Sequence, residues 1–103
     1  MEFILVLVTT ASEEEAEKIA QEIVKTHLAA CVNIVPRIKS IYFWKGEVCK
    51  DAESLLIIKT RGEKFDTLKE KIIQLHSYEV PEVIAIPIVK GSKAYLDWLA
   101  QVT

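Results

Sequence analysis

Residues 2–28 read EFILVLVTTASEEEAEKIAQEIVKTHL and pass from one secondary-structure pattern to another. The run from Glu2 to Thr10 is mainly aliphatic and β-branched, which predicts a strand. Ser12, followed three residues later by Glu15, forms a capping box and marks the start of a helix. Apolar residues then recur at helical spacing and predict one inward face: Ala16, Ile19, Ala20, Ile23, Val24 and Leu28.

The remaining chain continues to alternate between strand and helix patterns. These patterns predict a strand at 31–44 with a break or bulge at Pro36, a turn at 45–47, a strand containing 54–60, a helix at 63–76, a strand at 83–89 and a last helix at 92–101. We expect the last helix to place Tyr95, Trp98, Leu99 and Val102 on one side, with Tyr95 and Trp98 as core contacts.

The order of these elements predicts an α+β fold. A β-α-β-β-α-β core is the ferredoxin-like arrangement, with one antiparallel sheet, both main helices on one face, and here an extra C-terminal helix. Its usual strand order, 4-1-3-2, puts the second and fourth strands at the edges. Pro36 and Pro87 fall in those two strands, where proline is tolerated.

Composition narrows the class of protein. The 103 residues fit a single domain spanning 1–103, and a net charge of −2 gives no basic surface for nucleic acid. The apolar run at 3–8 is too short to span a membrane, so we expect a cytoplasmic protein. Cys31 and Cys49 form no Cys-x-x-Cys motif and are predicted to be free thiols. No HExxH, GxSxG or glycine-rich phosphate loop occurs, so we expect no enzyme.

The strands carry apolar residues on both faces. In a sheet with one wet face, apolar and polar residues should alternate, but residues 4–8, 55–58 and 83–89 are almost uniformly apolar. Each aliphatic side chain left in water forfeits roughly 1.5–3 kcal/mol of burial. We therefore expect a homo-oligomer formed through the open face of the sheet.

Five stretches, in order along almost the whole chain, resemble the CutA family of divalent-cation tolerance proteins. They are LAACVNIVP at 28–36, SIYFWKG at 40–46, LIIKT at 56–60, HSYEVPE at 76–82 and YLDWL at 95–99. The resemblance implies a ferredoxin-like fold similar to the PII signalling proteins, a homotrimer, and a role with divalent metal ions, copper above all.

The resemblance also implies where a metal ion would bind. His76 matches one of the family's proposed copper-ligand positions, whereas Thr9 and Leu75 stand where some members have a cysteine and a second histidine. One histidine per chain makes a poor site unless the symmetry of the trimer brings three together, or unless Cys31, Glu79 or Glu82 joins it. The alternative interpretation of His76 is structural, because it also stands where a side chain can cap the end of a helix.

A second implied site is a cleft between subunits. Tyr42, Trp44, Tyr78 and Glu82 resemble residues that line it, although aromatic side chains also serve interface packing. Lys59 follows four apolar residues and either extends to the surface or pairs with a carboxylate such as Glu82. Metal binding without catalysis is the leading hypothesis. The alternatives are a sensor that binds a small anionic metabolite through Lys59, Tyr78 and Trp44, and a structural or interaction trimer.

Overall fold

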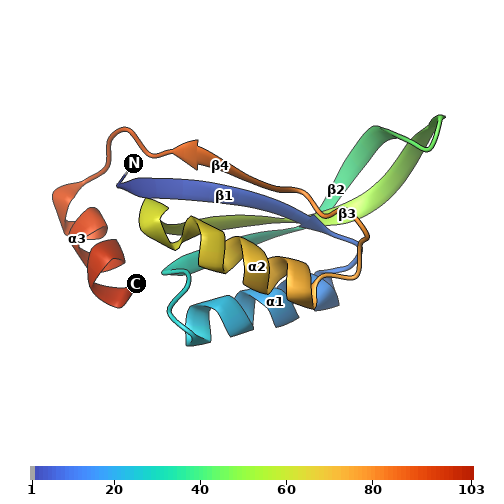
Figure 1. Ribbon diagram of the computed structural model, residues 1–103. Helices are drawn as coiled ribbons and strands as arrows, with labels where there is room; N and C mark the ends of the chain where they lie inside the picture. Colours follow the sequence, from blue (N-terminus) through green and yellow to red (C-terminus); the bar gives the residue numbers. More distant parts are fainter. Residues whose placement is uncertain (1) are drawn as a thin grey trace.

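The computed structural model describes residues 2–103 and contains a four-stranded antiparallel sheet with three α-helices. The elements are β1 (Phe3–Thr10), α1 (Glu13–Lys25), β2 (Cys31–Trp44), β3 (Glu47–Arg61), a 3₁₀ turn (Gly62–Lys64), α2 (Phe65–Leu75), β4 (Val83–Pro87) and α3 (Lys93–Val102). The strand order β2-β3-β1-β4 confirms the predicted 4-1-3-2 order, read from the opposite edge. Helices α1 and α2 cover one face of the sheet (Figure 1).

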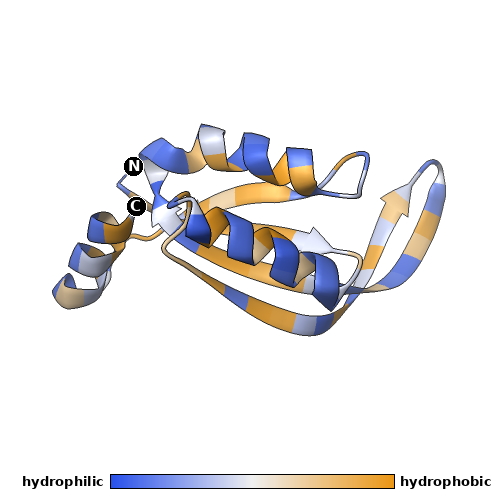
Figure 2. Ribbon diagram, turned by 90° about the horizontal axis from the view of Figure 1, so that it is seen from below, coloured by the Kyte–Doolittle hydropathy of each residue, from blue (hydrophilic) through white to orange (hydrophobic). Residues whose placement is uncertain are grey.

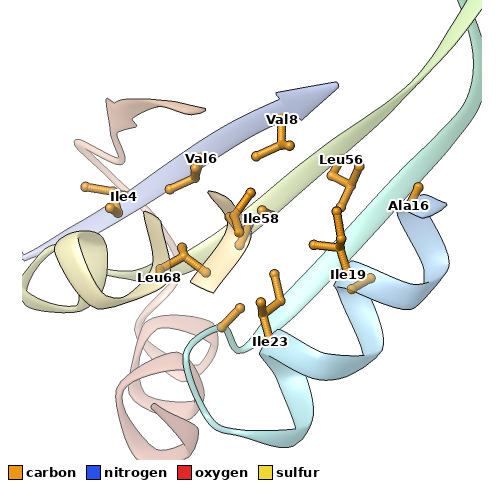
Figure 3. Packing of buried hydrophobic residues seen from close by; sticks show 12 residues of the cluster. Ile4, Val6, Val8, Ala16, Ile19, Ile23, Leu56, Ile58 and Leu68 are labelled. Atoms are coloured by element: carbon orange, nitrogen blue, oxygen red, sulfur yellow. The ribbon is translucent and has the colours of Figure 1, made fainter. Parts of the chain in front are cut away.

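The core lies between this sheet face and the two helices. Along β1 the buried positions alternate, so that Ile4, Val6 and Val8 point toward the helices. Figure 3 shows these side chains beside Leu56 and Ile58 of β3 and the helix residues that close the core. Those helix residues are Ala16, Ile19, Ala20 and Ile23 of α1 and Leu68 and Ile72 of α2. Val24, predicted on the inward face, is 39% exposed instead.

The ends of several elements differ from their predicted positions. The second helix begins at Phe65, after a 3₁₀ turn, and ends at Leu75 rather than at His76. Strand β4 ends at Pro87, which has no N–H to donate to a neighbour. The predicted bulge at Pro36 is confirmed, since the β2–β3 register shifts between Val35 and Ile38. Beyond it, β2 and β3 continue as a long hairpin that projects from the body (Figure 1).

The projecting hairpin is apolar as well as long. Ile41, Phe43 and Val48 are 64%, 71% and 72% exposed in the isolated chain. At its tip Lys45 and Gly46 both have positive φ, which fits a type I′ turn with the twist of a two-stranded ribbon. Exposed aliphatic and aromatic groups gathered in this way are typical of protein contact surfaces.

Seen from below in Figure 2, α1 and α2 lie in front of the sheet, and no helix of residues 2–103 lies over the second face (Figure 1). Directly opposite residues share a face, so the register gathers an apolar cluster there from three strands. We call this surface the outer face; its members are Leu5, Leu7, Ile57, Ile84 and Ile86. Ile84 and Ile86 remain 51% and 47% exposed. The predicted lack of alternation is thus present in the structure.

The last helix is less buried than predicted. Tyr95 and Trp98 are 41% and 40% exposed and lie against each other, with ring centroids 5.5 Å apart. Only Leu99 of α3 is fully buried. The reason is that α3 packs at one end of the sheet (Figure 1) and not within the helix layer. Within residues 2–103, no helix has both the length and the apolar composition needed to cross a bilayer.

Candidate functional site

His76 stands at the end of α2, where its backbone N–H still donates to Ile72 O at 2.9 Å. Its side chain is completely buried. The ring Nε2 lies 2.7 Å from the carbonyl oxygen of Thr9, and Nδ1 accepts the backbone N–H of Tyr78 at 3.0 Å. This network assigns the ring proton to Nε2. In this arrangement neither ring nitrogen offers a lone pair to a metal ion.

The carboxylate of Glu15 accepts two hydrogen bonds from the segment that follows His76. One carboxylate oxygen accepts the backbone N–H of Ser77 at 2.8 Å, and the other accepts the Ser77 hydroxyl at 3.1 Å. The predicted cap is present, because Glu15 N–H donates to Ser12 Oγ at 3.1 Å. These hydrogen bonds, together with those of His76, link the start of α1 and the end of β1 to the end of α2. They fix the direction in which residues 77–82 continue from α2.

A cavity of about 700 Å³ opens between residues 78–82 and the base of the hairpin. Its lining combines three aromatic residues, three carboxylates, one lysine and four smaller side chains: Tyr42, Trp44, Tyr78; Glu53, Glu79, Glu82; Lys39; and Thr9, Ser40, Ile41, Val80. Glu79 and Glu82 are exposed at the rim, whereas Glu53 is only 8% exposed. The charges around the cavity are therefore predominantly negative.

Two tyrosine hydroxyls in this region donate to carboxylates. Tyr78 OH donates to Glu53 Oε2 at 2.6 Å, and Tyr42 OH donates to Asp51. The hydrogen bond to Asp51 raises the pKa of Tyr42 to about 12. Burial, together with the hydrogen bond to Glu53, raises the pKa of Tyr78 still further. Both hydroxyls therefore remain protonated donors throughout the ordinary pH range.

These pKa shifts predict a loss of stability in alkaline solution. A pKa raised on folding stabilises the protein fully below the unfolded value of about 10, and this stability is lost as the pH rises toward the folded value. We expect the free energy of unfolding to fall between about pH 10 and pH 12, and to fall less in Tyr78→Phe. Denaturant titrations across this range, with tyrosinate absorbance recorded in parallel, measure both effects. A pH-independent unfolding free energy, or tyrosinate formation at the midpoint of free tyrosine, would contradict this assignment.

The cavity brings together most of the predicted cleft residues, but not Lys59. Lys59 Nζ hydrogen bonds to Asn33 and lies 3.9 Å from Cys31 Sγ, with no carboxylate within ion-pair distance among residues 2–103. Within one chain, Lys59 therefore contacts Asn33 and Cys31 rather than Glu82. Lys59, on which the hypothesis of an anionic ligand depends, is not among the residues that line this cavity in one chain.

Cys31 also lies apart from the other predicted ligands. In the sheet register, Cys31 is opposite Lys59, whereas Thr9, which contacts His76, is opposite Leu55. Four residues along a strand correspond to about 13 Å. Cys31 and His76 of one chain therefore cannot hold the same metal ion. Among residues 2–103, no three histidine, cysteine or acidic side chains are grouped as a metal site would require.

Sequence reasoning missed Glu53, which is the buried carboxylate of the cavity. Its position before the strand pattern at 54–60 resembles that of an ordinary polar residue in a hairpin. Only the register, which sets Ile38 opposite Glu53 beyond the bulge, and the bond from Tyr78 reveal its burial. Lys39 was missed for the same reason, because nothing local distinguishes it from other exposed hairpin residues.

A family model described as "CutA1 divalent ion tolerance protein" matches residues 4–102. The chain belongs to the CutA1 family. A CutA1 relative from Thermus thermophilus, named "Divalent-cation tolerance protein CutA", is 52% identical over 96% of each chain. "Protein CutA, chloroplastic" from Arabidopsis thaliana is 52% identical over 97% of this chain, which spans 55% of that relative. The crystal structure of CutA1 from Oryza sativa has a TM-score of 0.97 and 50% identity, covering 100% of this chain and 94% of the other.

The family match and the CutA1 relatives confirm the resemblance to the CutA family that was inferred from the five sequence stretches. They also support the α+β fold with its four-stranded antiparallel sheet. The family is named for tolerance of divalent ions and not for a catalysed reaction.

Proposed function

We propose that this CutA1 protein is a cytoplasmic, ferredoxin-like homotrimer that binds a divalent cation and contributes to metal tolerance without catalysis. The observation that carries the metal role is the position of Glu79 and Glu82, which are both exposed at the rim of one acidic cavity. The family's printed role in divalent-ion tolerance supports it. Two free cysteines fit a reducing compartment.

The uncovered outer face supports the trimer. In the isolated chain, the outer face and the hairpin both present large aliphatic and aromatic side chains to water. Continuous apolar patches of this kind mark association surfaces in soluble proteins. A second or third copy also addresses a chemical need, because one chain supplies only two rim carboxylates. Neighbouring chains would provide the further ligands that a stable site requires.

Copper(II) is the first cation to test. Both ring nitrogens of His76 are already hydrogen bonded, to Thr9 and Tyr78. Cys31 does not line the cavity. The proposed site therefore relies on carboxylate oxygens from Glu79 and Glu82. Oxygen ligands alone also accept Mn²⁺ and Ca²⁺, but copper(II) forms the tightest complexes in the divalent series. Binding is therefore expected to be tighter for Cu²⁺ than for Mn²⁺.

Calorimetric titration of Cu²⁺ tests this proposal. We expect the double variant Glu79→Gln/Glu82→Gln to bind Cu²⁺ at least about tenfold more weakly than wild type, which corresponds to about 1.4 kcal/mol. The variant Glu14→Gln/Glu17→Gln removes the same charge from the exposed side of α1 and is expected to bind as wild type does. An equal loss of Cu²⁺ affinity in the two variants would show that only the net charge of the protein matters. Wild-type affinity in Glu79→Gln/Glu82→Gln would refute the carboxylate site.

A further inference from the structure

Basic side chains gather on one face of the β2–β3 hairpin, near its bulge (Figure 1). Opposite residues share a face of the ribbon, and the register sets Lys39 opposite Ala52 and Ile41 opposite Lys50. Lys39 and Lys50 are therefore diagonal neighbours on one face, within reach of each other for such long side chains. Arg37 lies in the bulge and borders the same hollow.

These three cations have no counter-ion in the part of the chain that the structure describes. Within residues 2–103, no carboxylate oxygen lies within 4.0 Å of Arg37, Lys39 or Lys50. Asp51 borders the hollow, but the register places it on the other face of the ribbon, where it accepts the Tyr42 hydroxyl. A local excess of positive charge is thus present in a protein whose net charge is −2.

The hollow between the three cations is a groove of about 410 Å³, which falls within the usual size range of small-molecule sites. Its lining residues are Arg37, Ile38, Lys39, Lys50, Asp51 and Ala52. Side chains alternate along β3, so Ala52 shares its face with the buried residues Ser54 and Leu56, on the side of the sheet that carries the helices. The groove therefore lies apart from the outer face, through which we expect the chains to associate.

The groove selects a ligand with several negative charges. The guanidinium group of Arg37 presents paired N–H donors that match a phosphate group, and the two ammonium groups add point charges. A chain of phosphates carries a charge on each unit and can contact all three cations, whereas a single phosphate offers its charge at one point. A neighbouring hollow of about 270 Å³ shares Arg37 and Ala52, but Glu13 and Glu53 also line it and repel an anion. The ligand is thereby confined to the basic groove.

We propose that this groove binds an oligophosphate group, with Arg37, Lys39 and Lys50 as its counter-ions. The inference goes beyond the proposed metal role, because it uses cations of the hairpin and neither of the rim carboxylates, Glu79 and Glu82. Lys39 also lines the acidic cavity, whereas Arg37 and Lys50 do not, so these two residues are the ones to substitute. Either role can fail without the other.

Inorganic tripolyphosphate is the probe, titrated into ¹⁵N-labelled protein in the presence of EDTA so that the result is independent of metal binding. We expect saturable shifts of the Lys50 and Ala52 amide resonances below about 1 mM, and at least about tenfold weaker binding of orthophosphate. ATP is titrated in the same way. Equal affinity for ATP and tripolyphosphate assigns the phosphate chain alone as the ligand, and tighter binding of ATP with the same shifted resonances assigns a nucleotide.

Two results of these titrations would overturn the proposal. Lysines that only protect the edges of the ribbon from aggregation would give no saturable shift up to about 10 mM. Shifts of the Tyr78 amide in place of those of Lys50 and Ala52 would put the ligand in the acidic cavity instead.

Arg37→Gln/Lys50→Gln is the matching variant, and both residues are exposed, so we expect it to fold. It should bind tripolyphosphate at least about tenfold more weakly than wild type. Lys18→Gln/Lys25→Gln removes the same charge from exposed positions of α1 and should bind as wild type does. Equal losses in the two variants, or wild-type affinity in Arg37→Gln/Lys50→Gln, would refute the site. If the double variant does not fold, Lys50→Gln alone replaces it, with an expected loss of at least about threefold.

Discussion

Leu7→Lys is expected to reduce the mass of the protein in solution from three times the 11.7 kDa chain to a single chain. Leu7 lies in the middle of the outer face, with Ile57 opposite it on β3 and Ile84 opposite it on β4. In the proposed trimer an ammonium group at this position would be buried against apolar neighbours. The effective penalty for burying an unpaired ion is several kcal/mol, enough to dissociate an assembly at micromolar concentration.

Sedimentation equilibrium of wild type and variants measures this effect. Ile73→Lys makes the same chemical change at an exposed position on α2, which lies in the helix layer, and should leave the mass unchanged. A wild-type protein that is already monomeric, or a Leu7→Lys variant that keeps the wild-type mass, would refute assembly through the outer face. Far-ultraviolet circular dichroism confirms that the variants are folded.

His76→Ala is expected to lower the free energy of unfolding by about 2–4 kcal/mol, in the absence of any metal. The substitution removes a fully buried ring and leaves the Thr9 carbonyl and the Tyr78 N–H without their partners. Unpaired buried polar groups cost about 1–3 kcal/mol each when they cannot reach water. The residue thus acts chiefly in positioning the segment that carries Tyr78, Glu79 and Glu82.

His27→Ala is the matched control for this prediction. His27 makes one exposed hydrogen bond, from the ring Nδ1 to Val102 O at 3.0 Å, so its removal should cost under about 1 kcal/mol. Denaturant unfolding in EDTA, at one fixed protein concentration, compares the two variants. Equal losses in both, or a loss in His76→Ala that appears only when metal is present, would contradict the structural role of His76.

The fold could be predicted because its signals are local and repeat across the chain. Three independent features restrict the topology: the capping box at Ser12, the helical stripe through Ile19 and Ile23, and the two prolines in edge strands. The ends of elements were less predictable. The 3₁₀ turn before Phe65 and the exposure of Tyr95 depend on what packs against them, which sequence periodicity does not record.

The site was predicted only in part, because it depends on register and on hydrogen bonds between distant segments. The aromatic cleft residues came from the family resemblance, and the cavity does gather Tyr42, Trp44 and Tyr78. Within one chain, Lys59 and Cys31 lie away from these residues, because both belong to the opposite end of the β2–β3 pairing. Both ring nitrogens of His76 take part in hydrogen bonds, one with Thr9, which is 67 positions earlier, and one with Tyr78, which is two positions later. No local pattern indicates such a pair of contacts.

The position of a bound metal ion tests the central claim most directly. A crystal of the wild-type protein grown with Cu²⁺, with diffraction recorded at the copper absorption edge, locates the ion by its anomalous signal. We predict a peak within coordination distance of Glu79 or Glu82 at the cavity rim, with His76 still bonded to Thr9 and Tyr78. A peak on a His76 ring nitrogen, with the Tyr78 N–H or the Thr9 carbonyl displaced from it, would contradict the account.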